Sequence, residues 1–227
     1  TVEEPDVFPL AVQGPKAETL MTGLFGDGIA ALPYFGFGTF DVLGTRQVIA
    51  RSGYSKQGGF EIYLEGGHLG GALWDLVWEA GRGLEIRPGC PNLIERIEGG
   101  LMSYGNEFTR ANNPLECGFK RYCHLEDGID YIGREALLKI AEDGPDRHIM
   151  GVKFGGEPLS GVAVPLAVMA ADGTQVGQVT SGIWSPRLGC NVGMSMIARD
   201  HWDAGTAVIV RDADGAPHEG VVASLPL

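Results

Sequence analysis

The feature that most constrains the fold is a change of pattern at Asp143-Gly144-Pro145-Asp146, a cluster of turn-forming residues. Before this cluster, segments with a helical spacing of apolar residues are mixed with strand-like segments. After it, only short strand-like segments separated by turns remain. A chain of 227 residues is long enough for one large domain or two small ones. We therefore predict an α+β domain over residues 1–144 and an all-β domain, a small barrel or sandwich, over residues 145–227.

In the first part, apolar residues recur every three to four positions in some segments and every second position in others. The former predict helices and the latter predict strands. The predicted helices are residues 17–25, 69–80, 133–141 and a short one from Leu93 to Gly99-Gly100; the predicted strands are 6–12, 34–42, 45–51 and 60–65.

In the second part, Asp172-Gly173 and Asp214-Gly215 are dipeptides typical of hairpin turns. The segments between the turns of this part are predicted to be short strands. The predicted strands are residues 148–154, 162–170, 175–181, 191–197, 206–211 and 220–224.

Composition excludes several classes of protein. Acidic residues outnumber basic ones by 29 to 17, for a net charge of −12, so a nucleic-acid-binding face or an anionic membrane partner is not expected. The five histidines lack metal-ligand spacing, and we predict no metal site. Cys90, Cys117, Cys123 and Cys190 form no C-x-x-C pair, so we expect reduced, mostly buried thiols in a cytoplasmic protein.

The densest candidate for a functional site is SGYSKQGGFEIYLE, residues 52–65, where a glycine-flanked turn leads into an alternating strand. Phe60 and Ile62 share one face of that strand. Glu61 and Tyr63 share the other, and Tyr54 precedes the turn. A carboxylate with its two oxygens can accept two N–H donors from the edge of a flat 2-aminopyrimidinone ring. Aromatic side chains can stack on the face of the same ring. The same pattern also fits a solvated glutamate on the outer face of a sheet.

Six segments resemble the aminomethyltransferase (glycine cleavage T-protein) family, in the same order along the chain. They are LAVQGPKA (10–17), SGYSKQGGFEIYLE (52–65), RIEGGLMSYGNEF (96–108), NPLECG (113–118), YIGREAL (131–137) and GQVTSGIWSP (177–186). The resemblance implies a folate-binding, ferredoxin-like α+β domain followed by a C-terminal antiparallel β-barrel, with tetrahydrofolate as cofactor. It implies that Glu61 holds the pterin edge and that Tyr54 and Tyr63 line the same site. Tyr34, Phe35 and Phe37 are further candidates for an aromatic wall around a cationic substrate.

Within the family, the segment 89–100 and NPLECG are most similar to the branch that demethylates dimethylsulfoniopropionate. The resemblance thus implies methyl transfer from a small-molecule donor to tetrahydrofolate, giving 5-methyltetrahydrofolate. Asn92 stands where aminomethyltransferases carry an arginine, which favours the demethylating branch over them.

Members of the family begin well upstream of LAVQGPKA, so the resemblance also implies that this chain is a C-terminal portion of a longer enzyme. The catalytic residues are then expected in the N-terminal part. The chain is expected either to associate with that part or to form a homodimer. Three alternatives remain open: an aminomethyltransferase of a glycine cleavage system, a non-catalytic folate-binding module, and an interaction module cut from a fused dehydrogenase.

Overall fold

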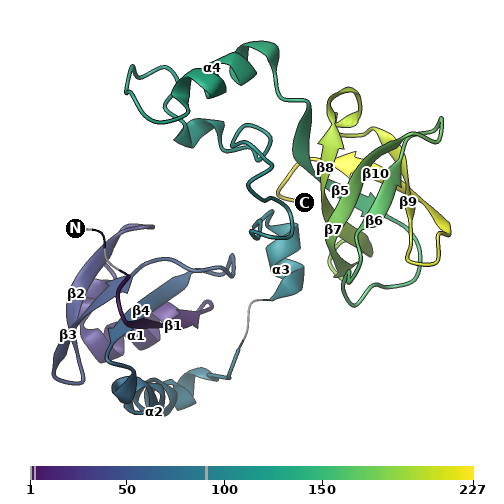
Figure 1. Ribbon diagram of the computed structural model, residues 1–227. Helices are drawn as coiled ribbons and strands as arrows, with labels where there is room; N and C mark the ends of the chain where they lie inside the picture. The colour runs from purple at the N-terminus through teal and green to yellow at the C-terminus, as the bar shows by residue number, and fades with distance from the viewer. Residues whose placement is uncertain (1, 3, 90–91) are drawn as a thin grey trace. The chain divides into compact units, whose positions relative to one another are not determined.

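The computed structural model describes residue 2, residues 4–89 and residues 92–227, so Cys90 and Pro91 lie outside the described residues. The chain folds into two compact units, Thr1–Asn92 (unit 1) and Leu93–Leu227 (unit 2), each with its own core (Figure 1). This division by contacts falls at a different place from the domain boundary expected after residue 144, and that boundary stays a prediction.

Unit 1 is a four-stranded antiparallel sheet in the order β1-β4-β3-β2, with helices α1 and α2 packed on one face. All six strands and helices predicted before residue 92 are present within three residues of their expected bounds. Its elements are β1 (Val7–Gln13), α1 (Ala17–Phe25), η1 (Asp27–Ile29), β2 (Phe37–Val42), β3 (Thr45–Ala50), β4 (Gly59–Glu65), η2 (Gly67–Leu69), α2 (Gly70–Gly81) and η3 (Arg82–Leu84).

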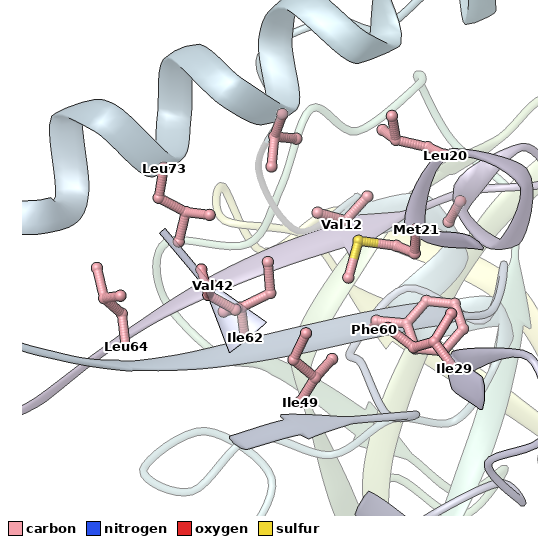
Figure 2. Close-up of a cluster of buried hydrophobic side chains, with 12 residues drawn as sticks. Val12, Leu20, Met21, Ile29, Val42, Ile49, Phe60, Ile62, Leu64 and Leu73 are labelled. Atoms are coloured by element: carbon pink, nitrogen blue, oxygen red, sulfur yellow. The ribbon is translucent and has the colours of Figure 1, made fainter. Parts of the chain in front are cut away.

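The core of unit 1 follows from the alternation in β4. Phe60, Ile62 and Leu64 are fully buried on the helix-covered face. Met21 of α1 and Leu73 of α2 descend onto them from the helices, as the side chains in Figure 2 show. Burying each such side chain contributes about 1.5–3 kcal/mol. The opposite face of β4, which carries Glu61 and Tyr63, therefore does not pack into this core and stays at least partly accessible.

Unit 2 contains a closed antiparallel barrel of six strands in the order β10-β5-β8-β7-β6-β9. The prediction of an α+β part followed by an antiparallel β-barrel is thereby confirmed. The elements of unit 2 are α3 (Leu93–Glu98), η4 (Lys120–Tyr122), α4 (Arg134–Asp143), β5 (Arg147–Phe154), β6 (Leu166–Met169), β7 (Gln175–Ser185), β8 (Cys190–Ala198), η5 (Arg199–His201), β9 (Ala207–Arg211) and β10 (Pro217–Ala223).

One predicted strand of the barrel was too long. The segment 162–170 was expected to be extended throughout, but β6 begins only at Leu166. Pro165 has no N–H to donate to a neighbouring strand, so the ladder starts after it.

A buried ion pair fixes the start of unit 2. The Arg96 guanidinium of α3 lies 3.0 Å from Glu107, whose side chain is 0% exposed. The same carboxylate accepts a hydrogen bond from the Ser103 backbone N–H at 2.6 Å, and Arg96 also donates to the Leu101 carbonyl oxygen. Because both charges are paired and hydrogen-bonded, their burial is tolerated.

Cys117 and Cys123 are buried free thiols and Cys190 is a partly exposed one, while Cys90 lies outside the described residues. The cytoplasmic location stays a prediction. No helix within the described part of the chain is long and apolar enough to cross a membrane.

Candidate functional site

A pocket of about 410 Å³ lies within unit 1, beside the edge strand β1. One side of its wall comes from β1 (residues 10–13), from β4 and from the loop before it. The other comes from α2 and the segment that follows η3, residues 86–89. Glu61 and Arg87 are the charged residues in this wall. Its volume falls within the usual range for small-molecule sites, about 300–1,000 Å³.

Glu61 lies in the wall of this pocket. It is paired across the sheet with Ala11 of β1 and Ala50 of β3, two small residues that leave its side chain partly accessible. The hydroxyl of Ser52 donates a hydrogen bond to Oε2 of Glu61, and the Tyr63 hydroxyl lies 3.5 Å from the same oxygen. Within the described residues, no donor reaches Oε1. The carboxylate is thus held on one oxygen and open on the other.

The structure brings Tyr54 and Glu61 together in the same pocket wall. Tyr63 touches the Glu61 carboxylate through its hydroxyl but is not part of the wall. The prediction that Tyr34, Phe35 and Phe37 add an aromatic wall finds no support in this pocket. They are 69–72% exposed and do not line it, because they lie at and before the start of β2, the strand at the far edge of the sheet from β1.

The pocket is built around Gln13, at the end of β1. Its amide nitrogen donates to the backbone oxygens of Ser52 (3.0 Å) and Phe60 (3.1 Å), and its amide oxygen accepts from the Ser55 hydroxyl (2.7 Å). One side chain therefore ties together β1, β4 and the loop that carries Tyr54.

Two glycines allow this arrangement. A Cβ at Gly53 would lie 2.0 Å from Oε1 of Gln13, and a Cβ at Gly59 would lie 2.3 Å from the Val12 carbonyl oxygen. Gly59 also has a φ of +148°, which favours glycine. The glycines in SGYSKQGG thus permit the close approach of backbone and side chain that shapes the pocket.

Several wall residues were missed by the sequence reasoning. Trp74 and Trp78 of α2 are spaced i, i+4, away from the stripe of apolar residues that faces the core, and this spacing was an available signal. Arg87 lies outside the regular elements, where periodicity gives no information. Ser52 and Gln13 were within quoted motifs, but a hydrogen bond between distant segments has no sequence pattern.

Within the described residues, no group of three or more His, Cys, Asp or Glu side chains is placed to hold a metal ion. The wall of the pocket instead offers a carboxylate, a guanidinium, a carboxamide and aromatic rings, which suit an organic ligand.

A sheet-and-helix unit with a carboxylate-bearing pocket, followed by a closed antiparallel barrel, defines a two-part protein of the α+β and β-barrel class. Models of the GCVT N-terminal domain and of the glycine cleavage T-protein C-terminal barrel domain match residues 2–127 and 147–227. The chain therefore belongs to the glycine cleavage T-protein family, whose members are folate-dependent transferases.

Curated relatives agree with this assignment. The chain is 49% identical to the dimethylsulfoniopropionate demethylase DmdA of Ruegeria pomeroyi over 215 residues, which cover 94% of this chain and 58% of the relative. It is 36% identical to the aminomethyltransferase of Symbiobacterium thermophilum over 211 residues, 90% of this chain and 55% of the relative. The chain thus spans less than two thirds of the length of these relatives.

A solved structure of the aminomethyltransferase of the glycine cleavage system from Bartonella henselae has the same fold. The TM-score is 0.75 at 24% sequence identity, and the match covers 96% of this chain and 58% of the other. At this identity, the likeness supports the architecture alone.

Proposed function

We propose that this chain is part of a tetrahydrofolate-dependent methyltransferase that demethylates dimethylsulfoniopropionate or a related methyl donor. The observation that carries the proposal is the Glu61 carboxylate in the pocket wall, held by Ser52 on one oxygen and open on the other. Family membership supports the use of folate. The 49% identity to a demethylase, against 36% to an aminomethyltransferase, supports the choice of reaction.

The wall of the pocket fits the cofactor chemically. The aminopyrimidinone edge of a reduced pterin presents adjacent N–H donors, and a carboxylate accepts them in a charge-assisted fork. Tyr54 supplies an aromatic ring beside that fork, and Tyr63, two positions further along β4, lies with its hydroxyl 3.5 Å from the carboxylate. Bound tetrahydrofolate would supply the ring nitrogen that accepts the methyl group of a sulfonium donor. The C–S bond would break with its electron pair left on the sulfur, and the ring nitrogen would lose its proton, giving a thioether, 5-methyltetrahydrofolate and a released proton.

The chain's own residues then act by placement. Glu61 fixes the orientation of the pterin plane, and the apolar wall from α2 excludes water from the cofactor. Holding two reactants in register contributes up to about 7–11 kcal/mol to lowering a barrier. We also propose that the methyl donor is a small molecule.

The test compares Glu61→Gln with the unchanged protein in tetrahydrofolate titrations, using the complete natural polypeptide that contains this chain. Gln keeps the shape but replaces an acceptor oxygen by a donor, so we expect affinity to fall by about 10- to 100-fold, as for the loss of a charge-assisted hydrogen bond. Glu65→Gln, on the same strand and exposed, is the matched control and should bind like the unchanged protein. Equal affinities for Glu61→Gln and the control would remove the pterin assignment.

An aminomethyltransferase is the second candidate, favoured by the relatives of that name at 31–36% identity. Supplying the enzyme with tetrahydrofolate and dimethylsulfoniopropionate separates the two. Formation of a thioether supports the demethylase. Turnover only of an aminomethylated carrier protein supports the aminomethyltransferase.

A further inference from the structure

We infer that two copies of this chain pair through the segment between α3 and α4 of unit 2, residues 99–133. A row of aromatic rings with exposed basic side chains forms one half of the contact. An acidic loop with exposed isoleucines forms the other half. In Figure 1 this segment lies between α3 and α4, outside the barrel. The inference concerns unit 2 alone, so it does not depend on the folate assignment in unit 1.

The aromatic row consists of four rings in successive edge-to-face contacts. The ring centroids are 5.6 Å apart for Tyr104 and Phe108, 6.3 Å for Phe108 and Phe119, and 6.0 Å for Phe119 and Tyr122. The two inner rings are partly buried, whereas Tyr104 and Tyr122 are 62% and 57% exposed. Because the inner rings hold the outer ones, the two tyrosines have little conformational freedom to lose when a partner binds.

Unpaired positive charges accompany the aromatic row. Arg110, Lys120 and Arg121 are exposed, and within the described residues none of them forms an ion pair. The Arg121 guanidinium lies over the ring of Tyr122, 4.6 Å from its centroid. The two glutamates of residues 99–122 are buried in internal ion pairs. The row is therefore a positive surface on a chain whose net charge is −12.

The acidic loop, residues 124–132, follows the row directly. It has three acidic residues and no lysine or arginine. Glu126 and Asp130 are exposed and form no ion pair with any described residue. Ile129 is 53% exposed and Ile132 is fully exposed. Apolar side chains beside unpaired carboxylates are complementary to rings beside unpaired cations.

The loop ends where it begins, beside the last ring of the row. The Tyr131 hydroxyl donates a hydrogen bond to the carbonyl oxygen of Cys123, the residue that follows Tyr122. Arg134, at the start of α4, donates to the Leu125 carbonyl oxygen at 2.8 Å. The row and the loop are therefore neighbours on one subunit. In a two-fold pair, the row of each copy can face the loop of the other, so the contact closes at two copies.

The acidity of the whole chain does not prevent this contact. Two copies with a net charge of −12 repel each other at long range. At physiological salt, however, exposed charges more than about 8–10 Å apart are largely screened, so the charges at the contact decide. The rings and isoleucines supply an apolar centre and the charged side chains a polar rim, which is the usual composition of an interface.

The experiment measures self-association of the complete natural polypeptide that contains this chain, by sedimentation velocity over a range of concentrations. We expect the unchanged protein to be a dimer in reversible equilibrium with its monomer. Lys120→Glu sets a negative charge against the acidic loop, and Asp130→Lys sets a positive charge against the row. Each should weaken the dimer by at least about 10-fold. Lys56→Glu, an exposed change of the same sign in unit 1, is the matched control and should dimerise like the unchanged protein.

Mixing the two variants tests the reciprocal geometry. In an equimolar mixture of Lys120→Glu and Asp130→Lys, each altered charge meets an opposite charge on the other copy. We therefore expect a heterodimer from two variants that are each monomeric alone. The double variant, which carries both changes in one chain, should dimerise again for the same reason. Far-UV circular dichroism checks that all variants are folded.

Three results would overturn the inference. The first is an unchanged protein that is monomeric at every concentration; protection of Tyr104 and Tyr122 from nitration in that monomer would show that the rest of the polypeptide covers the row. The second is dimerisation of Lys120→Glu and Asp130→Lys at the strength of the control, which would place the dimer contact elsewhere. The third is a mixture of the two folded variants that stays monomeric.

Discussion

Ser52 is the residue that converts Glu61 from a solvated side chain into an oriented one, because its hydroxyl donates to Oε2. We predict that Ser52→Ala leaves the Glu61 carboxylate in the pocket wall but less well oriented. Tetrahydrofolate affinity should fall by about 2- to 10-fold, which is less than for Glu61→Gln, since only a neutral donor is lost. Calorimetric titration measures the difference, with the exposed Ser160→Ala as control; an unchanged affinity for Ser52→Ala would mean that Ser52 does not position Glu61.

Glu98 gives unit 2 a defined dependence on pH. Burial raises the pKa of its carboxyl, but hydrogen bonds from Ser185 (2.5 Å) and Arg187 (2.7 Å) and the charge of Arg187 outweigh it, so the pKa lies below its ordinary value of 4.5. A lowered pKa in the folded state means that the stability from this group is complete above pH 4.5. This contribution of Glu98 to stability is lost as the pH falls through the lowered pKa that Glu98 has in the folded state.

We therefore predict that Glu98→Gln lowers the urea midpoint of unit 2 at pH 7, and that this deficit shrinks as the solution is acidified below pH 4.5. The exposed Glu142→Gln serves as control and should follow the unchanged protein at every pH. A deficit that stays constant down to acid pH would contradict the assignment.

Glu61 and Tyr54 could be located from the sequence, because their spacing around a glycine-rich turn is local and matches a family. The support from Ser52 and Gln13 could not, since these contacts join segments 9 and 39–47 residues apart and depend on how the strands register. Arg87 was not predicted as a pocket residue for a different reason. A charged residue in an irregular segment is normally solvated, and only the fold shows that Arg87 lines a pocket.

At the scale of elements, strand β4 depends on its first residue. Gly59 pairs with Gln13 and has no room for a Cβ, which would lie 2.3 Å from the Val12 carbonyl oxygen. We predict that Gly59→Ala destabilises unit 1 by about 1–3 kcal/mol, as overpacking does. Gly71→Ala in α2 is the matched control, because nothing lies within 4 Å of its added Cβ. It should be neutral or stabilising by up to about 1 kcal/mol.

Chemical denaturation followed by far-UV circular dichroism measures both variants. Equal stabilities for the two alanine variants would show that the strand adapts to the extra atom.

The helices and strands themselves were largely predictable from the sequence, because β4 alternates and α1 has its apolar residues on one face. The start of β6 at Leu166 was not predicted, because residues 162–164 have a strand-like sequence and the effect of Pro165, which has no N–H to donate, was not taken into account.

At the scale of the whole molecule, each core cluster of described residues lies within a single unit. Ile62→Ala should therefore cost unit 1 about 2–5 kcal/mol and leave the barrel intact. Hydrogen exchange would be faster at the amides of β1, β3 and β4 and unchanged in β5 and β8. Val152→Ala, buried in the barrel, should give the converse pattern. Faster exchange in both units for either variant would show that the two cores unfold together.

The barrel closes on itself, but the four-stranded sheet ends at β1 and β2. A closed ladder leaves no strand to recruit a neighbour, whereas a terminal strand presents backbone donors and acceptors to any extended peptide. We therefore expect strand-to-strand association between copies of this chain to begin at an edge of the sheet rather than at the barrel. A charged residue introduced on β2, away from the pocket, would protect the preparation without touching the cofactor site.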